Sequence, residues 1–238
     1  MSNFDVIAFD ADDTLWENEH LYVNAQARLV ELLSRYHPAE WINERMYQTE
    51  MRNLEQFGYG IKAFALSMIE TAVELTEGRI SGSELQTLVD LAKEMLHAKV
   101  DLLPHTLETL SQLKTKYALM LLTKGDLFEK ENKIARSELR DCFRYVEIVS
   151  TKTTSVYKGL LEKYAIPPRR FLMVGNALRS DILPLLELGA YAIYIPHELT
   201  WQHENSVPPP AGQAGYYQLE HIGQLPTLLE SLENTKME

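Results

Sequence analysis

The feature that most constrains the fold is a series of short apolar runs separated by segments with helical periodicity. The runs are Phe4–Phe9, Tyr117–Leu122, Tyr145–Val149, Phe171–Gly175 and Ala190–Ile195. A nearly continuous apolar run of this length is typical of a strand buried on both faces of a parallel sheet. Alternation of such strands with helices predicts an α/β fold with a doubly wound parallel sheet, a Rossmann-like core.

The tract between the first two runs contains no strand-like segment. Apolar residues recur there at helical spacing in four stretches, and Ser81 and Glu84 form the capping box that begins the fourth. We therefore expect an all-helical cap domain, residues 16–100, inserted into an α/β core domain made of residues 1–15 and 101–238. A final strand and helix are expected within 216–232.

Composition narrows the location and the partners. The chain of 238 residues has 23 Lys and Arg against 34 Asp and Glu, a net charge of −11, which argues against a nucleic-acid partner. The single cysteine excludes an internal disulfide, and the start of the chain does not resemble a secretory signal. The apolar runs are far shorter than the roughly 20 residues of a membrane span. We expect a cytoplasmic protein, a monomer or a homodimer, that does not bind membranes.

The first apolar run ends in a cluster of acids, Asp10-Ala11-Asp12-Asp13-Thr14. Ligands of open α/β sheets bind beyond the carboxyl ends of the strands. In extended backbone Asp10 and Asp12 face the same way, and their repulsion requires a proton or a cation to relieve it. Taken alone, these residues fit equally well a helix N-cap with spare acids in the first turn.

The pattern Asp10-x-Asp12-x-Thr14 after an apolar strand resembles motif I of the haloacid dehalogenase-like (HAD) superfamily of phosphohydrolases. Three further segments resemble motifs II, III and IV in the same order: Leu121–Gly125, Lys152 ahead of the helix Ser155–Tyr164, and Met173–Asp181. The helical insert lies where this superfamily carries its type-1 cap. The resemblance covers nearly the whole chain, and it is specific for the superfamily but not for a substrate.

The resemblance implies a role for each matching residue. Asp10 would be the nucleophile that forms an aspartyl-phosphate, and Asp12 the general acid and base. Thr123 and Lys152 would also be catalytic. The phosphate would be bound by Thr123, Lys124, Gly125 and Lys152. Lys158 is the competing candidate for the motif III lysine.

The resemblance also implies a Mg²⁺ ion held by Asp10, Asp12, Asn176 and Asp181. Asn176 stands where the superfamily usually has an aspartate, and an amide oxygen offers Mg²⁺ less charge. The alternative is that Asn176 only forms a turn. The dehalogenase branch also has an asparagine near this position and uses no metal, but it lacks the second aspartate of motif I. Asp12 therefore favours phosphoryl transfer.

The expected function is that of a Mg²⁺-dependent phosphatase acting on a small phosphorylated metabolite. One alternative is a phosphomutase that returns the phosphoryl group to a sugar, and another is a non-catalytic binding module on the same fold. Trp16 lies where the chain enters the cap, and we expect it in the cap core or on the cap surface. The alternative is that it contacts substrate. We interpret His197 and His203 as loop histidines and Asp13 as a turn residue.

Overall fold

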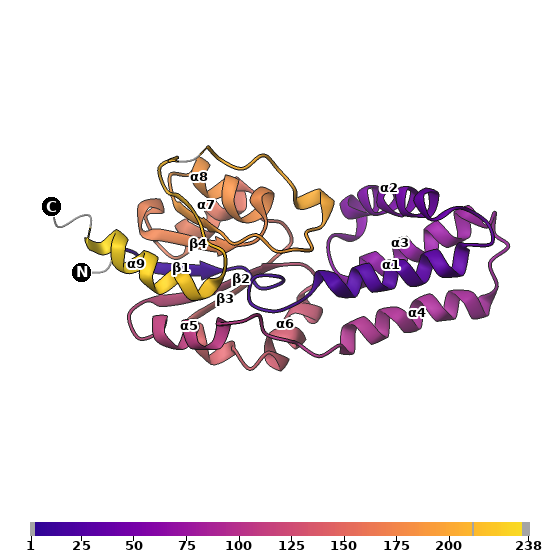
Figure 1. Ribbon diagram of the computed structural model, residues 1–238, viewed down its shortest axis with the longest axis horizontal. Coiled ribbons are helices and arrows are strands. Elements are labelled where there is room, and N and C mark those ends of the chain that lie inside the picture. Colours follow the sequence, from indigo (N-terminus) through magenta and orange to yellow (C-terminus); the bar gives the residue numbers. More distant parts are fainter. Residues whose placement is uncertain (1–2, 211, 235–238) are drawn as a thin grey trace. The chain divides into compact units, whose positions relative to one another are not determined.

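The computed structural model describes residues 3–210 and 212–234. Its α/β unit is built on one parallel sheet, of which β1 to β4 are labelled in Figure 1. The sheet has six strands in the order β3-β2-β1-β4-β5-β6. The strands are β1 (Val6–Phe9), β2 (Ala118–Lys124), β3 (Tyr145–Val149), β4 (Phe171–Gly175), β5 (Tyr191–Tyr194) and β6 (Tyr216–Gln218). The predicted parallel α/β sheet is confirmed.

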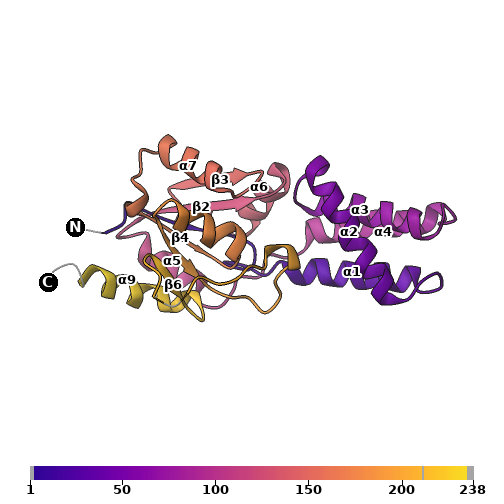
Figure 2. The same cartoon turned by 90° about the horizontal axis from the view of Figure 1, so that it is seen from above.

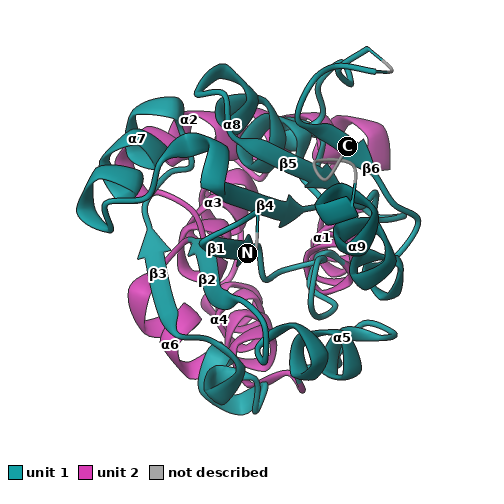
Figure 3. Ribbon diagram, turned by 90° about the vertical axis from the view of Figure 1, so that its left-hand side faces the viewer, with its two compact units in different colours: residues 1–19, 100–124, 133–238 teal, residues 20–99, 125–132 magenta. Residues whose placement is uncertain are grey.

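Helices cover both faces of this sheet because alternate strand residues point to opposite sides. Ile7 and Phe9 pack in the hydrophobic cluster that includes leucines of the helices α5 (Thr106–Leu113) and α9 (Leu225–Asn234). Val6 and Ala8 pack in a second cluster with α7 (Thr154–Lys163) and α8 (Leu183–Glu187). Figure 3 shows α7 and α8 on one side of the sheet and α5 and α9 on the other.

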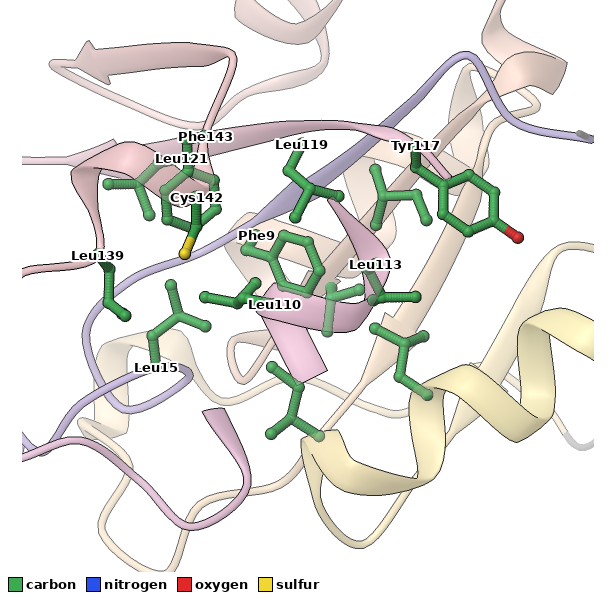
Figure 4. Packing of buried hydrophobic residues seen from close by; sticks show 14 of the residues in the cluster. Phe9, Leu15, Leu110, Leu113, Tyr117, Leu119, Leu121, Leu139, Cys142 and Phe143 are labelled. Carbon is green, nitrogen blue, oxygen red and sulfur yellow. The ribbon is translucent and has the colours of Figure 1, made fainter. Parts of the chain in front are cut away.

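The first of these clusters fixes the end of β1, from which the acidic motif continues. Phe9 lies among Leu110, Leu113 and Leu121 (Figure 4). Its ring meets Phe143 edge-on, with centroids 6.2 Å apart. Each such side chain contributes about 1.5–3 kcal/mol on burial, so the carboxyl end of β1 is held by a well-packed support.

The second compact unit consists of residues 20–99 and 125–132 (Figure 3). Its long helices are α1 (Glu19–Leu33), α2 (Ala39–Phe57), α3 (Ile61–Leu75) and α4 (Gly82–His97), which run roughly alongside one another in Figures 1 and 2. The predicted capping box is present, because Glu84 N–H donates to Ser81 Oγ at 3.2 Å and Ser81 N–H donates to Glu84 Oε2 at 2.8 Å. No helix of the described residues has the length and apolar character needed to cross a membrane.

The buried face of α2 is partly polar. Met46 is buried, but Phe57 at the end of the helix is 54% exposed. Asn53 is also buried, and its amide donates to Ser67 Oγ of α3 at 3.1 Å. A polar side chain is tolerated at a helix interface when its hydrogen bonds are satisfied there, which an apolar stripe does not reveal.

Residues 125–132 were expected in the α/β core, whereas the structure places them in the helical unit. They include the start of α6 (Leu127–Arg136). Glu129 accepts a hydrogen bond from the backbone N–H of Ile61 at 2.8 Å, and Lys62 pairs with Asp126 at 2.8 Å. The helical unit is therefore completed by a segment that directly follows β2.

Candidate active site

The acidic motif begins where β1 ends. The backbone N–H of Asp10 donates to Val174 O of β4 at 2.9 Å, so the strand geometry continues to the first acid. Because β1 lies between β2 and β4, the carboxyl ends of those strands bring Thr123 and Asn176 to the same edge of the sheet. This is the edge at which a ligand site is expected.

Lys152 reaches Asp10 from the segment that follows β3. Its Nζ lies 2.5 Å from Asp10 Oδ1 and 2.7 Å from Asp181 Oδ1, and its side chain is only 2% exposed. Burial alone would lower the pKa of Lys152, but the charges of Asp10 and Asp181 outweigh it and raise that pKa. The ammonium is therefore a fixed positive charge beside Asp10, whereas the competing candidate Lys158 is exposed on α7.

Asp181 holds this lysine from the other side. It lies in a π-helical turn, Leu178–Ile182, and its Oδ2 accepts the backbone N–H of Ala177 at 3.1 Å. Burial raises the pKa of Asp181 to about 6, and the Asp10 charge acts in the same direction against Lys152. Both carboxylate oxygens thus have protein donors, which suits a group that orients Lys152.

Gly175, the last residue of β4, makes this arrangement possible. A Cβ atom added at Gly175 would lie 2.4 Å from Asp181 Oδ2, far inside contact distance. The glycine of motif IV is therefore required by the close approach of the Asp181 carboxylate.

Asn176 and Asp10 meet at the hydroxyl of Thr14. Thr14 Oγ1 lies 3.2 Å from Asn176 Oδ1 and 3.4 Å from Asp10 Oδ2. A carboxylate oxygen and an amide oxygen thus both lie within hydrogen-bond distance of one hydroxyl group, and both are hard ligands of the kind that Mg²⁺ prefers. All three residues are buried. This donor set fits a divalent cation, with Asp10 and Asn176 as the residues that would hold it.

The carboxylate of Asp12 has different partners. Its Oδ1 accepts hydrogen bonds from Trp16 Nε1 at 2.8 Å and from Lys133 Nζ at 2.6 Å. The structure therefore brings the side chains of Asp10, Asn176 and Asp181 together and turns that of Asp12 towards Trp16 and Lys133. Sequence reasoning did not single out Lys133, which carries no motif signal of its own.

The motif II residues differ in what their side chains do. Thr123 is buried next to β3, opposite Ile148. The ammonium of Lys124, which was expected at the phosphate, is ion-paired with Glu204 and donates to Ser180 Oγ at 2.8 Å. Gly125 has a φ of +139°, a conformation that side-chain-bearing residues rarely adopt.

A second group of possible metal ligands consists of Asp13, Glu17 and His197, whose ligand atoms lie within 4.8 Å of one another. Burial raises the pKa of Asp13 to about 6, although the backbone N–H of Glu19 opposes the shift. The Asp13 backbone is left-handed (φ 56°), as a turn residue requires. His197 comes from the loop after β5, and no local pattern could connect it with the acids.

The family model of the haloacid dehalogenase-like hydrolases matches residues 4–189. The chain belongs to this family. The motif order that suggested the resemblance is therefore confirmed at the level of the HAD family.

Individual HAD relatives resemble most of the chain. A 5-amino-6-(5-phospho-D-ribitylamino)uracil phosphatase of Escherichia coli is 24% identical over 82% of this chain and 84% of its own length. A glyceraldehyde 3-phosphate phosphatase of Pyrococcus furiosus is 25% identical over 98% of this chain and 95% of its own. The crystal structure of a HAD-like hydrolase from Xanthomonas campestris is 35% identical, covers 98% of this chain and 93% of its own, and superposes with a TM-score of 0.87.

Proposed function

We propose that this HAD-like hydrolase cleaves the phosphoric monoester of a small metabolite through an aspartyl-phosphate formed on Asp10, with the help of Mg²⁺. The observation that carries the proposal is the fixed cation of Lys152 against Asp10, at the sheet edge where Asn176 supplies a further oxygen. Family membership and two relatives named as phosphatases support the phosphomonoesterase class.

In the first step a carboxylate oxygen of Asp10 attacks phosphorus. The bond from phosphorus to the ester oxygen breaks, its electron pair stays on that oxygen, and Asp12 donates a proton to it. Lys152 holds Asp10 in place and offers positive charge to the phosphoryl oxygens. Uncatalysed hydrolysis of these esters is among the slowest reactions known, so this charge stabilisation must be large.

In the second step water attacks phosphorus while Asp12 accepts the proton of the water. The bond between phosphorus and Asp10 breaks, inorganic phosphate leaves, and the Asp10 carboxylate and the acid form of Asp12 are regenerated. An acyl-phosphate suits this step because it is labile towards water. Thr123 and the backbone N–H groups of Lys124 and Gly125 would bind the phosphate oxygens.

The metal would be held by Asp10 and Asn176. When bound, Mg²⁺ neutralises charge on the phosphoryl group. Asp181 would act by orienting Lys152 rather than by its own free oxygens, because both of them accept protein hydrogen bonds.

The test is phosphate release from p-nitrophenyl phosphate in the presence of Mg²⁺. We expect Asp10→Asn to abolish it, because the amide is not a competent nucleophile. Asp90→Asn is the matched control, since Asp90 is a surface acid paired with Lys93 on α4. Equal turnover by Asp10→Asn and the parent would exclude Asp10 as the nucleophile.

A screen of phosphorylated metabolites with the parent protein identifies the substrate class. We expect free phosphate as the product. An isomerised sugar phosphate without phosphate release would instead establish the mutase alternative.

A further inference from the structure

The structure points to a device that positions Asp12, built by residues outside the four motifs. Lys133 lies on α6, which follows β2 and Gly125 in the chain. Its side chain is 6% exposed, and its Nζ lies 2.6 Å from Asp12 Oδ1. The motif order of the family does not predict a cation at this place, so the contact arises from the tertiary structure of this chain.

Lys133 is itself held on two further sides. Its Nζ also lies 2.6 Å from Asn18 Oδ1, and it stands over the Trp16 ring, 6.0 Å from the centroid. Asn18 and Trp16 are both buried. A buried ammonium that is held by a carboxylate, an amide oxygen and an aromatic face has little freedom, so it defines a fixed point in the site.

Trp16 adds a second anchor for the same atom. Its indole N–H donates to Asp12 Oδ1 at 2.8 Å, so two N–H donors bind this one oxygen. The backbone supports the arrangement, because Asp13 N–H donates to Trp16 O at 2.7 Å and closes a tight loop. Because Asp12 Oδ1 receives two N–H donors, it acts as an acceptor whether the carboxyl group is protonated or ionised.

We infer that Lys133, together with Trp16, is a positioning residue that anchors Asp12 through Oδ1 and so fixes the orientation of its carboxyl group for the acid and base steps. The inference rests on the proposed function, in which Asp12 donates a proton to the leaving oxygen and later takes one from water. The anchor keeps one orientation of the carboxyl group through both steps, and neither Lys133 nor Trp16 gains or loses a proton.

The test compares two probes that differ by one methylene group, p-nitrophenyl phosphate and p-nitrobenzyl phosphate. The first releases a weakly basic phenolate, whereas the second releases a strongly basic alkoxide that needs the proton from Asp12. The value of kcat/KM reports only steps up to formation of the aspartyl-phosphate, so it isolates the acid step. Asp12→Asn gives the reference for complete loss of proton donation.

For Lys133→Met we expect kcat/KM for the benzyl ester to fall about 10- to 100-fold, which is only part of the roughly 100- to 10,000-fold that general acid catalysis supplies. The value for the phenyl ester should change by less than about threefold. Trp16→Phe should act in the same direction with a smaller loss, and Lys133→Arg should restore part of the benzyl activity. Lys163→Met, which removes a surface lysine paired with Glu147, should leave both values unchanged.

Equal loss for both esters, no loss for either, or a rise for the benzyl ester would overturn the inference. Trp16→Phe carries the same test if Lys133→Met does not fold. If the parent is active and the ratio of kcat/KM for the benzyl ester to kcat/KM for the phenyl ester is the same in the variants, only the positioning role is excluded. A parent and Asp10→Asn with the same activity would remove the proposed function itself.

Discussion

Charged side chains are used in opposite ways at the acidic motif of the α/β unit and along the helices α1–α4. In the first, Lys152 and its partners Asp10 and Asp181 have side chains that are 2%, 11% and 1% exposed. In the second, Arg52 and its partner Glu70 are 50% and 48% exposed. The same types of charged group are thus almost excluded from solvent at the acidic motif and are in contact with solvent on the helices α1–α4.

Buried and exposed ion pairs differ in the free energy that is lost when one partner is removed. A buried charge that loses its partner is strongly destabilising, because its desolvation is no longer compensated. An exposed pair gains little, because water and salt screen it. The buried charges therefore need an explanation other than stability, and the proposed chemistry at Asp10 offers one. The surface pairs need no functional explanation.

Lys152→Met should produce the largest effect. It leaves two buried carboxylates without their cation, and we expect a loss of about 3–5 kcal/mol in the free energy of unfolding, together with loss of phosphate release. The measurement is urea unfolding in EDTA, so that no metal replaces the lost charge. Unchanged stability would show that the site is wetter than its exposed fractions indicate.

Glu50→Gln tests a partly buried acid of α2, which departs from the exposed ion pairs of the helices α1–α4. Burial raises the pKa of Glu50 from 4.5 to about 7. Folding therefore disfavours the ionised form: the folded state retains a proton that the unfolded state has lost, and stability falls as pH rises from 4.5 to 7. The variant should gain up to about 3 kcal/mol at pH 8 and much less at pH 5.

The control for this variant is Glu55→Gln, because Glu55 is exposed on the same helix. Urea unfolding of both variants and the parent at the two pH values measures the differences. The same gain at both pH values would mean that ionisation of Glu50 is not its origin.

Asn176→Asp adds a charge to the buried site. We expect tighter Mg²⁺ binding, by roughly tenfold, because a carboxylate oxygen carries more charge than an amide oxygen. Calorimetric titration of Mg²⁺ into the EDTA-treated protein measures the affinity. Unchanged or weaker binding would count against Asn176 as a direct ligand.

Arg52→Ala should have the smallest effect. Arg52 also lies 3.7 Å from Glu74, but the exposure of these groups limits the loss to about 0.5 kcal/mol in the free energy of unfolding. A loss of unfolding free energy as large as that of Lys152→Met would contradict the difference between the buried and the exposed ion pairs.

The sequence predicts most of the sheet and the motif residues. The runs Tyr145–Val149 and Phe171–Gly175 coincide with β3 and β4, because strands buried on both faces contain few polar residues. The position of Lys152 follows from the order of the motifs. The roles assigned to the site residues, the cytoplasmic location and the monomer or homodimer state stay predictions.

Other parts of the site could not be predicted. Lys133 and His197 join the acidic motif only through the folded chain, and neither lies in a local pattern that distinguishes it from a surface residue. The ion pair of Lys124 with Glu204 also joins two distant segments, because Lys124 ends β2 and Glu204 follows β5. Contacts between distant segments depend on packing that periodicity does not encode.

The grouping of residues 125–132 with the helical insert sets a rule for protein engineering. A chimera that exchanges only residues 20–99 would leave the buried carboxylate of Glu129 without the backbone N–H of Ile61. The transplantable module therefore has two pieces, and the shorter one begins one peptide bond after Lys124. Grafts intended to change specificity should carry both pieces together.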